Sequence, residues 1–251
     1  MGIIGLFSYC FFRIAAYFGK KIRNYNIYYK NLNGKNGIDI GGPSEMFKKG
    51  KILPIYPIVK SVDICNIHPV SADIKYLCDA LELKMISSEA YDFVLSSHTI
   101  EHIANPLKAL TEWLRILKGK GIILLVVPNK ERTIDHKRPV TALAHLIEDF
   151  KGNVGADDDT HSQEILELVD PTYDFGPYNR QVFEDLVKNN SAKRVMHLHV
   201  YNKQLLIEIF NYLGLQILSV DEIMPCHIAI LGKKVVKGKA NNAAFINRGE
   251  R

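Results

Sequence analysis

Acidic residues stand close to glycines near the start of the chain, in a pattern that suits a ligand with ribose hydroxyls. Asp39 lies in the short apolar run 38–40, which ends at Gly41 and Gly42. Glycines after a strand let a ligand approach the backbone. Asp63 follows roughly 20 residues later, and a carboxylate at a strand end can accept hydrogen bonds from both ribose hydroxyls. Each feature alone is more often a simple turn or cap, so the pattern depends on their spacing.

Histidines follow two of the strand-like runs and could move a proton. His98 and His102 come after the run 91–96, and His136 comes after the run 121–127, two residues before Arg138. Imidazole is the side chain best suited to accept a proton near neutral pH. We expect His98 to face a bound ligand and His102 to be structural. His136 is a candidate general base and Arg138 a candidate anchor for a phosphate or carboxylate, against the alternative of an ordinary charged loop.

Further histidines and the cysteines are candidates for metal ligands. His161, His197 and His199, together with the acidic run 157–159, could bind a divalent metal. Their spacing matches no metal motif, and acidic runs are usually solvated or cap helices, so we assign no metal site. The cysteines, which are scattered and form no CxxC pair, are expected to be reduced, buried thiols; they are Cys10, Cys65, Cys78 and Cys226.

Alternating strand and helix signals would position these residues. Of the 251 residues, 47% are apolar, enough for a substantial core. The runs 38–40, 61–65, 91–96 and 121–127 are typical of strands buried on both faces of a parallel sheet. A helix is predicted at 105–118, with Pro106 in its first turn. After residue 202 the pattern returns, with a helix at 203–213 and strands at 215–220 and 227–231.

The intervening segment 129–200 lacks strand runs, which indicates a cap inserted after the fifth strand. We therefore predict an α/β fold with a doubly wound, mostly parallel sheet, a core at 36–128, the cap, closing elements at 201–236 and a flexible tail at 237–251. The N-terminal segment 1–35 contains an apolar run at 3–18, interrupted by Arg13. It is too short for a membrane span and predicts an amphipathic helix, either packed on the domain or lying on a membrane surface.

One stretch resembles a known family in the order of its motifs. Residues 92–128 contain Asp-x-Val, then Glu101-His102, Pro106, the Arg-x-Leu-Lys of residues 115–118, a glycine turn and an apolar strand ending in Pro128. This is similar to class I S-adenosylmethionine (SAM)-dependent methyltransferases of the subgroup with Glu-His after the fourth strand. The resemblance implies a seven-stranded Rossmann-like sheet and SAM as cofactor.

The resemblance also implies roles for individual residues. Asp39, Gly41 and Gly42 match the glycine-rich SAM loop, and Asp63, followed by Ile64, matches the ribose-binding acid. Asp79 and Ala80 match the pair that contacts adenine, while Ser97 and His98 match positions beside the methionine moiety. The chain departs from the family where Pro43 and Ser44 replace the end of the D-x-G-x-G loop. Pro54 and Pro57 also interrupt the helix that normally follows this loop.

The expected activity is methyl transfer to a polar small molecule or sugar, at oxygen or nitrogen. The cap contains aromatic and polar residues suited to sugars, and it resembles bacterial methyltransferases of surface polysaccharides; these residues are Tyr173, Phe175, Tyr178, Arg180, His197 and His199. The net charge of +5 gives little reason to expect nucleic acid. We expect a cytoplasmic protein, with peripheral membrane contact if the N-terminal helix lies on a membrane. The alternatives are a non-catalytic SAM-binding scaffold and an NAD-dependent oxidoreductase, which would need a G-x-G-x-x-G turn that is absent.

Overall fold

The computed structural model describes residues 22, 24–175, 179–236 and 238–246. The side chains of residues 174 and 175 are not described. The predicted amphipathic helix at 3–18, Cys10 and Tyr178 therefore lie outside the described residues, as does the end of the chain from residue 247.

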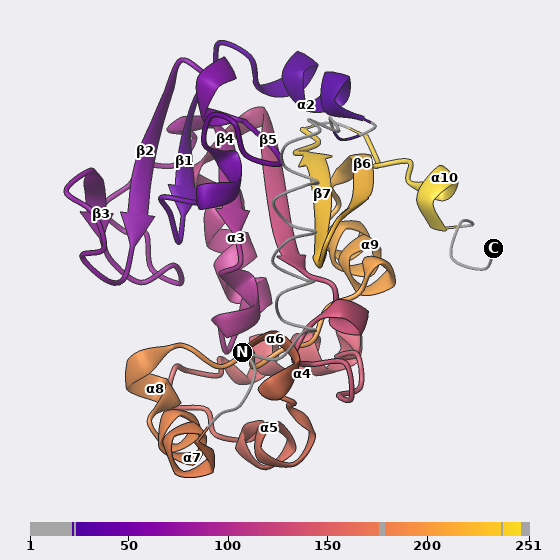
Figure 1. The fold of residues 1–251 in the computed structure, drawn as a ribbon. Helices are drawn as coiled ribbons and strands as arrows, with labels where there is room; N and C mark the ends of the chain where they lie inside the picture. Colours follow the sequence, from indigo (N-terminus) through magenta and orange to yellow (C-terminus); the bar gives the residue numbers. More distant parts are fainter. Residues whose placement is uncertain (1–21, 23, 176–178, 237, 247–251) are drawn as a thin grey trace.

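A seven-stranded sheet forms the centre of the molecule, in the order β3-β2-β1-β4-β5-β7-β6 (Figure 1). All neighbouring pairs are parallel except those of β7, which runs antiparallel to both β5 and β6. This is a doubly wound, mostly parallel Rossmann-like sheet, so the predicted fold class is confirmed. The strands are β1 (Asn36–Ile40), β2 (Ser61–Asn66), β3 (Ile74–Leu77), β4 (Tyr91–Ser97), β5 (Leu117–Pro128), β6 (Gln216–Ile223) and β7 (His227–Lys233).

Helices cover both faces of the sheet, as the continuous apolar strands require. One core lies against α3 (Pro106–Ile116) and α9 (Lys203–Tyr212). The other lies against α2 (Tyr25–Leu32) and the short helices η1 (Glu45–Phe47) and η2 (Tyr56–Ile58). Between β1 and β2 only these two 3₁₀ turns form, which confirms that this stretch is irregular.

The connection from α3 to β5 differs from its prediction. Asn105 caps the helix by accepting a hydrogen bond from the Lys108 N–H, and Pro106 occupies the first turn as expected. The helix ends at Ile116, however, and β5 begins at once with Leu117. The predicted turn after the helix is instead part of the strand, where Lys120 adopts a left-handed backbone with φ +65°. The β4–β5 register shifts there, so an irregular strand replaces a separate turn.

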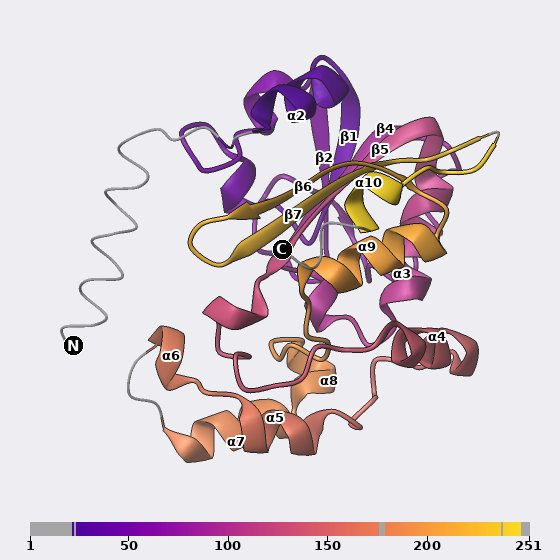
Figure 2. The ribbon, with the colours of Figure 1, turned by 90° about the vertical axis from the view of Figure 1, so that its right-hand side faces the viewer.

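The segment between β5 and α9 contributes no strand to the described sheet. It contains η4 (Lys130–Arg132), α4 (Leu143–Gly152), α5 (Ser162–Leu168), α6 (Thr172–Phe175), α7 (Arg180–Lys188) and α8 (Asn190–Lys193). Figures 1 and 2 show α5, α7 and α8 gathered beyond the end of the sheet toward which β1 and β2 point. A last short helix, α10 (Ala243–Ile246), follows β7. Among the described residues, none of the helices has the length and apolar character needed to cross a membrane.

Candidate active site

The turn after β1 forms the floor of the candidate site. Gly41 has φ +85°, and a Cβ at this position would lie 1.9 Å from Oγ1 of Thr99. Only glycine meets both conditions, because other residues disfavour this backbone region and none has room here. Asn66, the last residue of β2, donates from Nδ2 to the carbonyl oxygens of Gly41 (3.1 Å) and Gly42 (2.7 Å). The turn is therefore fixed by the ends of two neighbouring strands.

Asp39 is a completely buried carboxylate behind this turn. Its Oδ2 accepts hydrogen bonds from the hydroxyl of Tyr56 (2.5 Å) and from the backbone N–H of Ser44 (2.9 Å). Its Oδ1 is buried without a hydrogen-bond partner. Burial raises the pKa of Asp39 to about 6 in spite of these donors. Oδ1 of Asp39 would therefore be stabilised by a hydrogen-bond donor or a positive charge.

A cavity of about 450 Å³ opens beside the turn, within the size range of small-molecule sites. Gly41 and Ser44 line one part of it, and Ser97, His98 and His227 line another. The cavity thus lies at the carboxyl ends of β1 and β4, where ligands bind in open α/β sheets.

His98 follows β4 directly and is held in an uncommon backbone conformation. Its φ is +52°, which is disfavoured for any residue other than glycine. Its N–H donates to the carbonyl of Val126 (2.9 Å). On the ring, Nε2 lies 2.8 Å from Nδ1 of His227, and Nδ1 lies 3.4 Å from Oε1 of Glu101. Burial, reinforced by His98, lowers the pKa of His227 to about 3, so His227 is neutral near pH 7.

Glu101 connects His98 to the cap. Its side chain is fully buried, and neither carboxylate oxygen has a well-formed hydrogen bond. Burial opposes its ionisation, but His98, His102 and His197 together outweigh burial and hold the pKa of Glu101 below its usual range. The imidazoles act through their proximity, because the 3.4 Å between Nδ1 of His98 and Oε1 of Glu101 is an ion-pair distance rather than a good hydrogen bond.

Residues of the cap lie next to Glu101 and extend this group of ionisable side chains. Nδ1 of His197 lies 2.5 Å from Oδ2 of Asp135, and the ring of His197 packs edge-on against His102. Burial lowers the pKa of His197, but the stronger combined effect of Asp135 and Glu101 raises it. His102 is oriented by the carbonyl of Met196 (3.0 Å), in keeping with the structural role expected for it.

Two predicted cofactor residues on β2 lie away from the cavity. Asp63 is three residues before the end of the strand, beside Ile38 in the β1–β2 register. Its Oδ2 accepts from Nζ of Lys75 (2.7 Å) and from the hydroxyl of Tyr91 (2.6 Å). Ile64 is buried in the sheet. The polar residue that faces the glycine turn from the end of β2 is Asn66, which the sequence reading passed over.

The predicted adenine pair follows β3 and contacts both a core helix and the cap. Oδ2 of Asp79 accepts from Nη2 of Arg194, which follows α8 (3.3 Å). The carbonyl of Ala80 accepts from Nε1 of Trp113, a fully buried residue of α3 (2.9 Å). This loop is therefore fixed at both residues, outside the cavity lining.

The structure places His136 and Arg138 outside the cavity lining, at contacts within the cap. Nδ1 of His136 lies against the Thr133 carbonyl and its ring against Tyr173, away from the cavity lining. Arg138 is 1% exposed, and its guanidinium donates to Asp135, to Glu164 and to two backbone carbonyls. The guanidinium is thus buried and engaged within the cap, and these contacts favour a structural contribution over an anchor for a substrate anion.

Besides Asn66, two further residues of the site were missed, and one of them had a usable signal. His227 opens β7, and because β7 is antiparallel, its first residue lies at the same edge of the sheet as the last residues of β4 and β5. The apolar run that starts at His227 could have indicated this, given the strand order. Tyr56 could not have been found, because its contact with Asp39 depends on an irregular loop.

Comparisons with known proteins agree with this arrangement. Residues 57–125 match a family model described as "Methyltransferase domain". A comparison with curated proteins found no match. Similar solved structures include a SAM-dependent methyltransferase from Aquifex aeolicus, with 12% identity over 85% of this chain and 90% of that chain and a TM-score of 0.47. They also include N-methyltransferase NodS from Bradyrhizobium japonicum in complex with S-adenosyl-L-homocysteine, with 10% identity over 83% and 82% of the two chains and a TM-score of 0.45. Residues 57–125 thus match a methyltransferase domain, and they lie within a sheet that has the Rossmann-like strand order described above.

Proposed function

We propose that this protein transfers the methyl group of SAM to a hydroxyl of a polar small molecule, with a sugar as the acceptor class that fits best. The observation that carries the proposal is the position of the His98–His227 pair. Both imidazoles line the same cavity as the glycine turn, and a buried carboxylate stands behind one of them. An imidazole backed by a carboxylate is an arrangement that removes a proton from a hydroxyl.

The residues around the turn fit a cationic, hydroxyl-bearing cofactor. The unpartnered Oδ1 of Asp39 supplies a negative charge that a donor or cation would satisfy. Gly41 keeps the cavity floor open, and Ser97 offers a hydroxyl from the end of β4. We assign the ribose contact to Oδ1 of Asn66 in preference to Asp63, because Asn66 stands at the end of β2 and this oxygen, which accepts from the N–H of His68, can accept a second hydrogen bond. Asp79 and Ala80 stay candidates for the adenine side, with Gly42 in the turn.

SAM, when bound, supplies a methyl group activated by its sulfonium. The protein's own contribution is to align the acceptor, exclude water and hold a proton. With its Nδ1–H directed at Glu101, His98 accepts at Nε2 the Nδ1–H of His227, which leaves the free lone pair of the pair on Nε2 of His227. The proton of the acceptor hydroxyl then passes to Nε2 of His227 while the Nδ1 proton of His227 moves to Nε2 of His98, and the charge of Glu101 stabilises the imidazolium that results at His98.

The surroundings of the cavity favour a small polar acceptor. Glu45, Lys51 and Ser44 line it together with the two imidazoles. Such groups can hydrogen-bond several hydroxyls of one molecule, as sugar recognition requires. The resemblance of the cap to polysaccharide-associated methyltransferases supports the same class. We also propose that the cap, at residues 129–200, contributes to the acceptor site. Peripheral membrane contact through the N-terminal segment is a further part of the proposal.

Binding and turnover test the proposal separately. Calorimetric titration with SAM, using NAD as a control, is expected to show micromolar SAM binding and no NAD response. Release of S-adenosyl-L-homocysteine is then measured over a panel of monosaccharides, nucleotide-sugars and small amines. We expect turnover with a hydroxyl acceptor. His98→Asn should abolish this turnover, and His68→Asn, a control at an exposed histidine, should leave it intact. Turnover confined to amines would refute the hydroxyl acceptor, and absent SAM binding would refute the cofactor assignment.

A further inference from the structure

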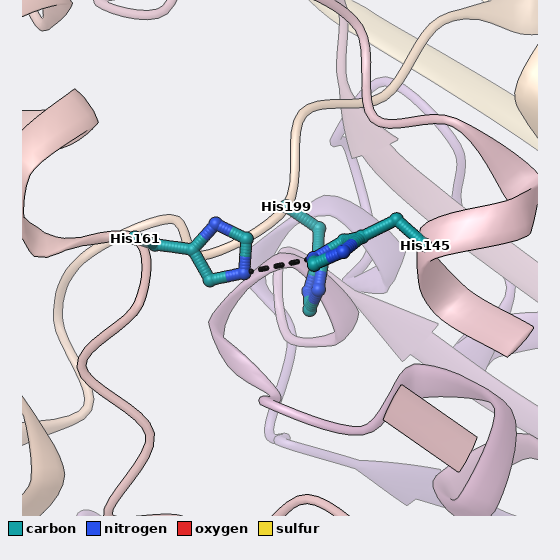
Figure 3. Close-up of side chains that lie close together, drawn as sticks. All are labelled: His145, His161 and His199. Carbon is teal, nitrogen blue, oxygen red and sulfur yellow. Dashed lines mark hydrogen bonds between the residues drawn. The ribbon is translucent and has the colours of Figure 1, made fainter. Parts of the chain in front are cut away.

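Three histidines of the cap meet at a place separate from the cavity. His145 lies on α4, His161 immediately precedes α5, and His199 lies between α8 and α9. Each offers a ring nitrogen, and these nitrogens all lie within 4.8 Å of one another. Figure 3 shows the three rings converging from separate segments. We propose that these residues bind a divalent metal ion of the Zn²⁺ class.

The distances resemble those of a tetrahedral site. Zn–N bonds of 2.0–2.1 Å place the ligand atoms of a tetrahedron about 3.3 Å apart. Nε2 of His145 lies 3.2 Å from Nε2 of His161. Oδ2 of Asp149 lies 3.2 Å from Nε2 of His199 and 3.4 Å from Nε2 of His145. Asp149 thus offers a carboxylate oxygen as a fourth ligand atom beside two of the imidazoles. It lies one helical turn from His145 on the same face of α4.

The hydrogen-bond pattern of His199 leaves room for one further proton or a metal ion. Its ring is fully buried, with Nδ1 3.1 Å from the carbonyl of Ile103 and Nε2 3.2 Å from Asp149. Both partners are acceptors, so a neutral imidazole with one proton would face one of them with a lone pair. A second proton or a metal ion must fill this contact. Donation of Nδ1–H to a backbone carbonyl, with Nε2 free, is the orientation that metal-binding histidines usually adopt.

The contact between His145 and His161 points the same way. Two Nε2 atoms 3.2 Å apart can share one proton, but both can instead direct lone pairs at one metal ion. The side chain of His145 is 37% exposed, so an ion can enter from solvent.

A metal here would fix the cap to the core beside the active site. Backbone N–H groups of Leu198 and His199 donate to the carbonyl of Glu101 (2.8 and 3.3 Å). Asn105, at the start of α3, donates to the carbonyl of Asp149 (2.8 Å). The ion would therefore hold three cap segments together and, through His199, the backbone of Glu101.

The experiment uses the full chain with any affinity tag removed and metals stripped by a chelator. Zn²⁺ uptake is measured by competition with a chromophoric chelator, Co²⁺ binding by its visible spectrum, and stability by thermal unfolding. We expect one Zn²⁺ per chain, a tetrahedral Co²⁺ spectrum and a higher unfolding temperature with Zn²⁺. None of these readouts needs SAM or an acceptor, so their result is independent of the proposed enzymatic activity.

Single substitutions then assign the site. His145→Ala and His161→Ala replace the two partly exposed ligands, and His68→Ala replaces an exposed histidine outside the cluster. Because loss of an outer-shell partner alone costs 10–100-fold in affinity, we expect loss of a ligand to lower Zn²⁺ affinity by at least about 100-fold. His68→Ala should behave as the parent chain. A parent chain that takes up no Zn²⁺, or ligand variants that circular dichroism shows to be folded and that bind Zn²⁺ unchanged, would overturn the proposal. In that case a protonated His199 paired with Asp149 fills the contact.

Discussion

Replacing Asp39 with asparagine should change how stability depends on pH. Asp39 is fully buried and its pKa is raised to about 6 from the ordinary value of 3.8. Between these two values the folded chain holds a proton that the unfolded chain has released. The folded state therefore gains stability as pH falls from 6 toward 4, and the ionised carboxylate destabilises it above pH 6.

The size of this effect follows from the two pKa values. Between pH 7.5 and pH 4.5, one group with these values makes the folded state about 2 kcal/mol more stable relative to a chain that lacks it. Asp39→Asn cannot titrate, so this contribution should disappear from its pH profile. Constant effects of the substitution, such as a buried amide N–H₂ without an acceptor, shift the whole profile and cancel in the comparison.

Urea unfolding of both proteins across this pH range measures the difference. The free energy of unfolding of the parent chain minus that of Asp39→Asn is expected to rise by about 2 kcal/mol from pH 7.5 to pH 4.5. Calorimetry should also show weaker SAM binding by the variant, since a cationic ligand would lose this charge. A difference that stays constant with pH, or that falls on acidification, would refute the reasoning about the buried carboxylate.

Three other substitutions test the surrounding geometry. Glu101→Gln should lower turnover about 100-fold at unchanged SAM affinity, because a charge 3.4 Å from the partly exposed His98 is worth roughly 2–3 kcal/mol after screening; unchanged turnover on an identified acceptor would rule out this positioning role. Gly41→Ala should destabilise the protein by more than the roughly 1–2 kcal/mol expected for Gly34→Ala, since both have positive φ but only Gly41 would also clash with a neighbour; equal unfolding energies for the two variants would contradict this. Arg138→Met should cost about 3–5 kcal/mol in urea unfolding, because it leaves buried acceptors unpaired, whereas a substrate anchor would leave stability unchanged.

The sheet could be predicted because its strands carry their own signal. Runs such as 121–127 contain only apolar residues and suit strands covered on both faces, and the structure buries them in this way. The short strand β3 has no such run, since its residues alternate between half-buried and exposed at the edge of the sheet. The end of α3 was placed two residues too late, because a strand that follows a helix without a turn leaves no glycine or proline at the boundary.

The site was predictable only where it depends on the strand ends. Gly41, Ser97 and His98 line the cavity because Ser97 ends β4, and Gly41 and His98 directly follow β1 and β4. Arg138 looked like an anchor because its sequence neighbours are charged and polar, and nothing local showed that distant carbonyls would surround it. The meeting of His145 with His161 and His199 depends in the same way on the folding of the cap.

The reversed direction of β7 determines when the active site can form. His98 and His227 are separated by 129 positions in the chain, and the hairpin of β6 and β7 brings the second imidazole to the first. During synthesis on the ribosome, β1, β4 and β5 emerge first, together with the glycine turn and His98. The cavity gains its second imidazole only after the hairpin has emerged and inserted beside β5. A nascent chain that stops before β7 is therefore expected to lack the complete site, whatever the state of its cofactor turn.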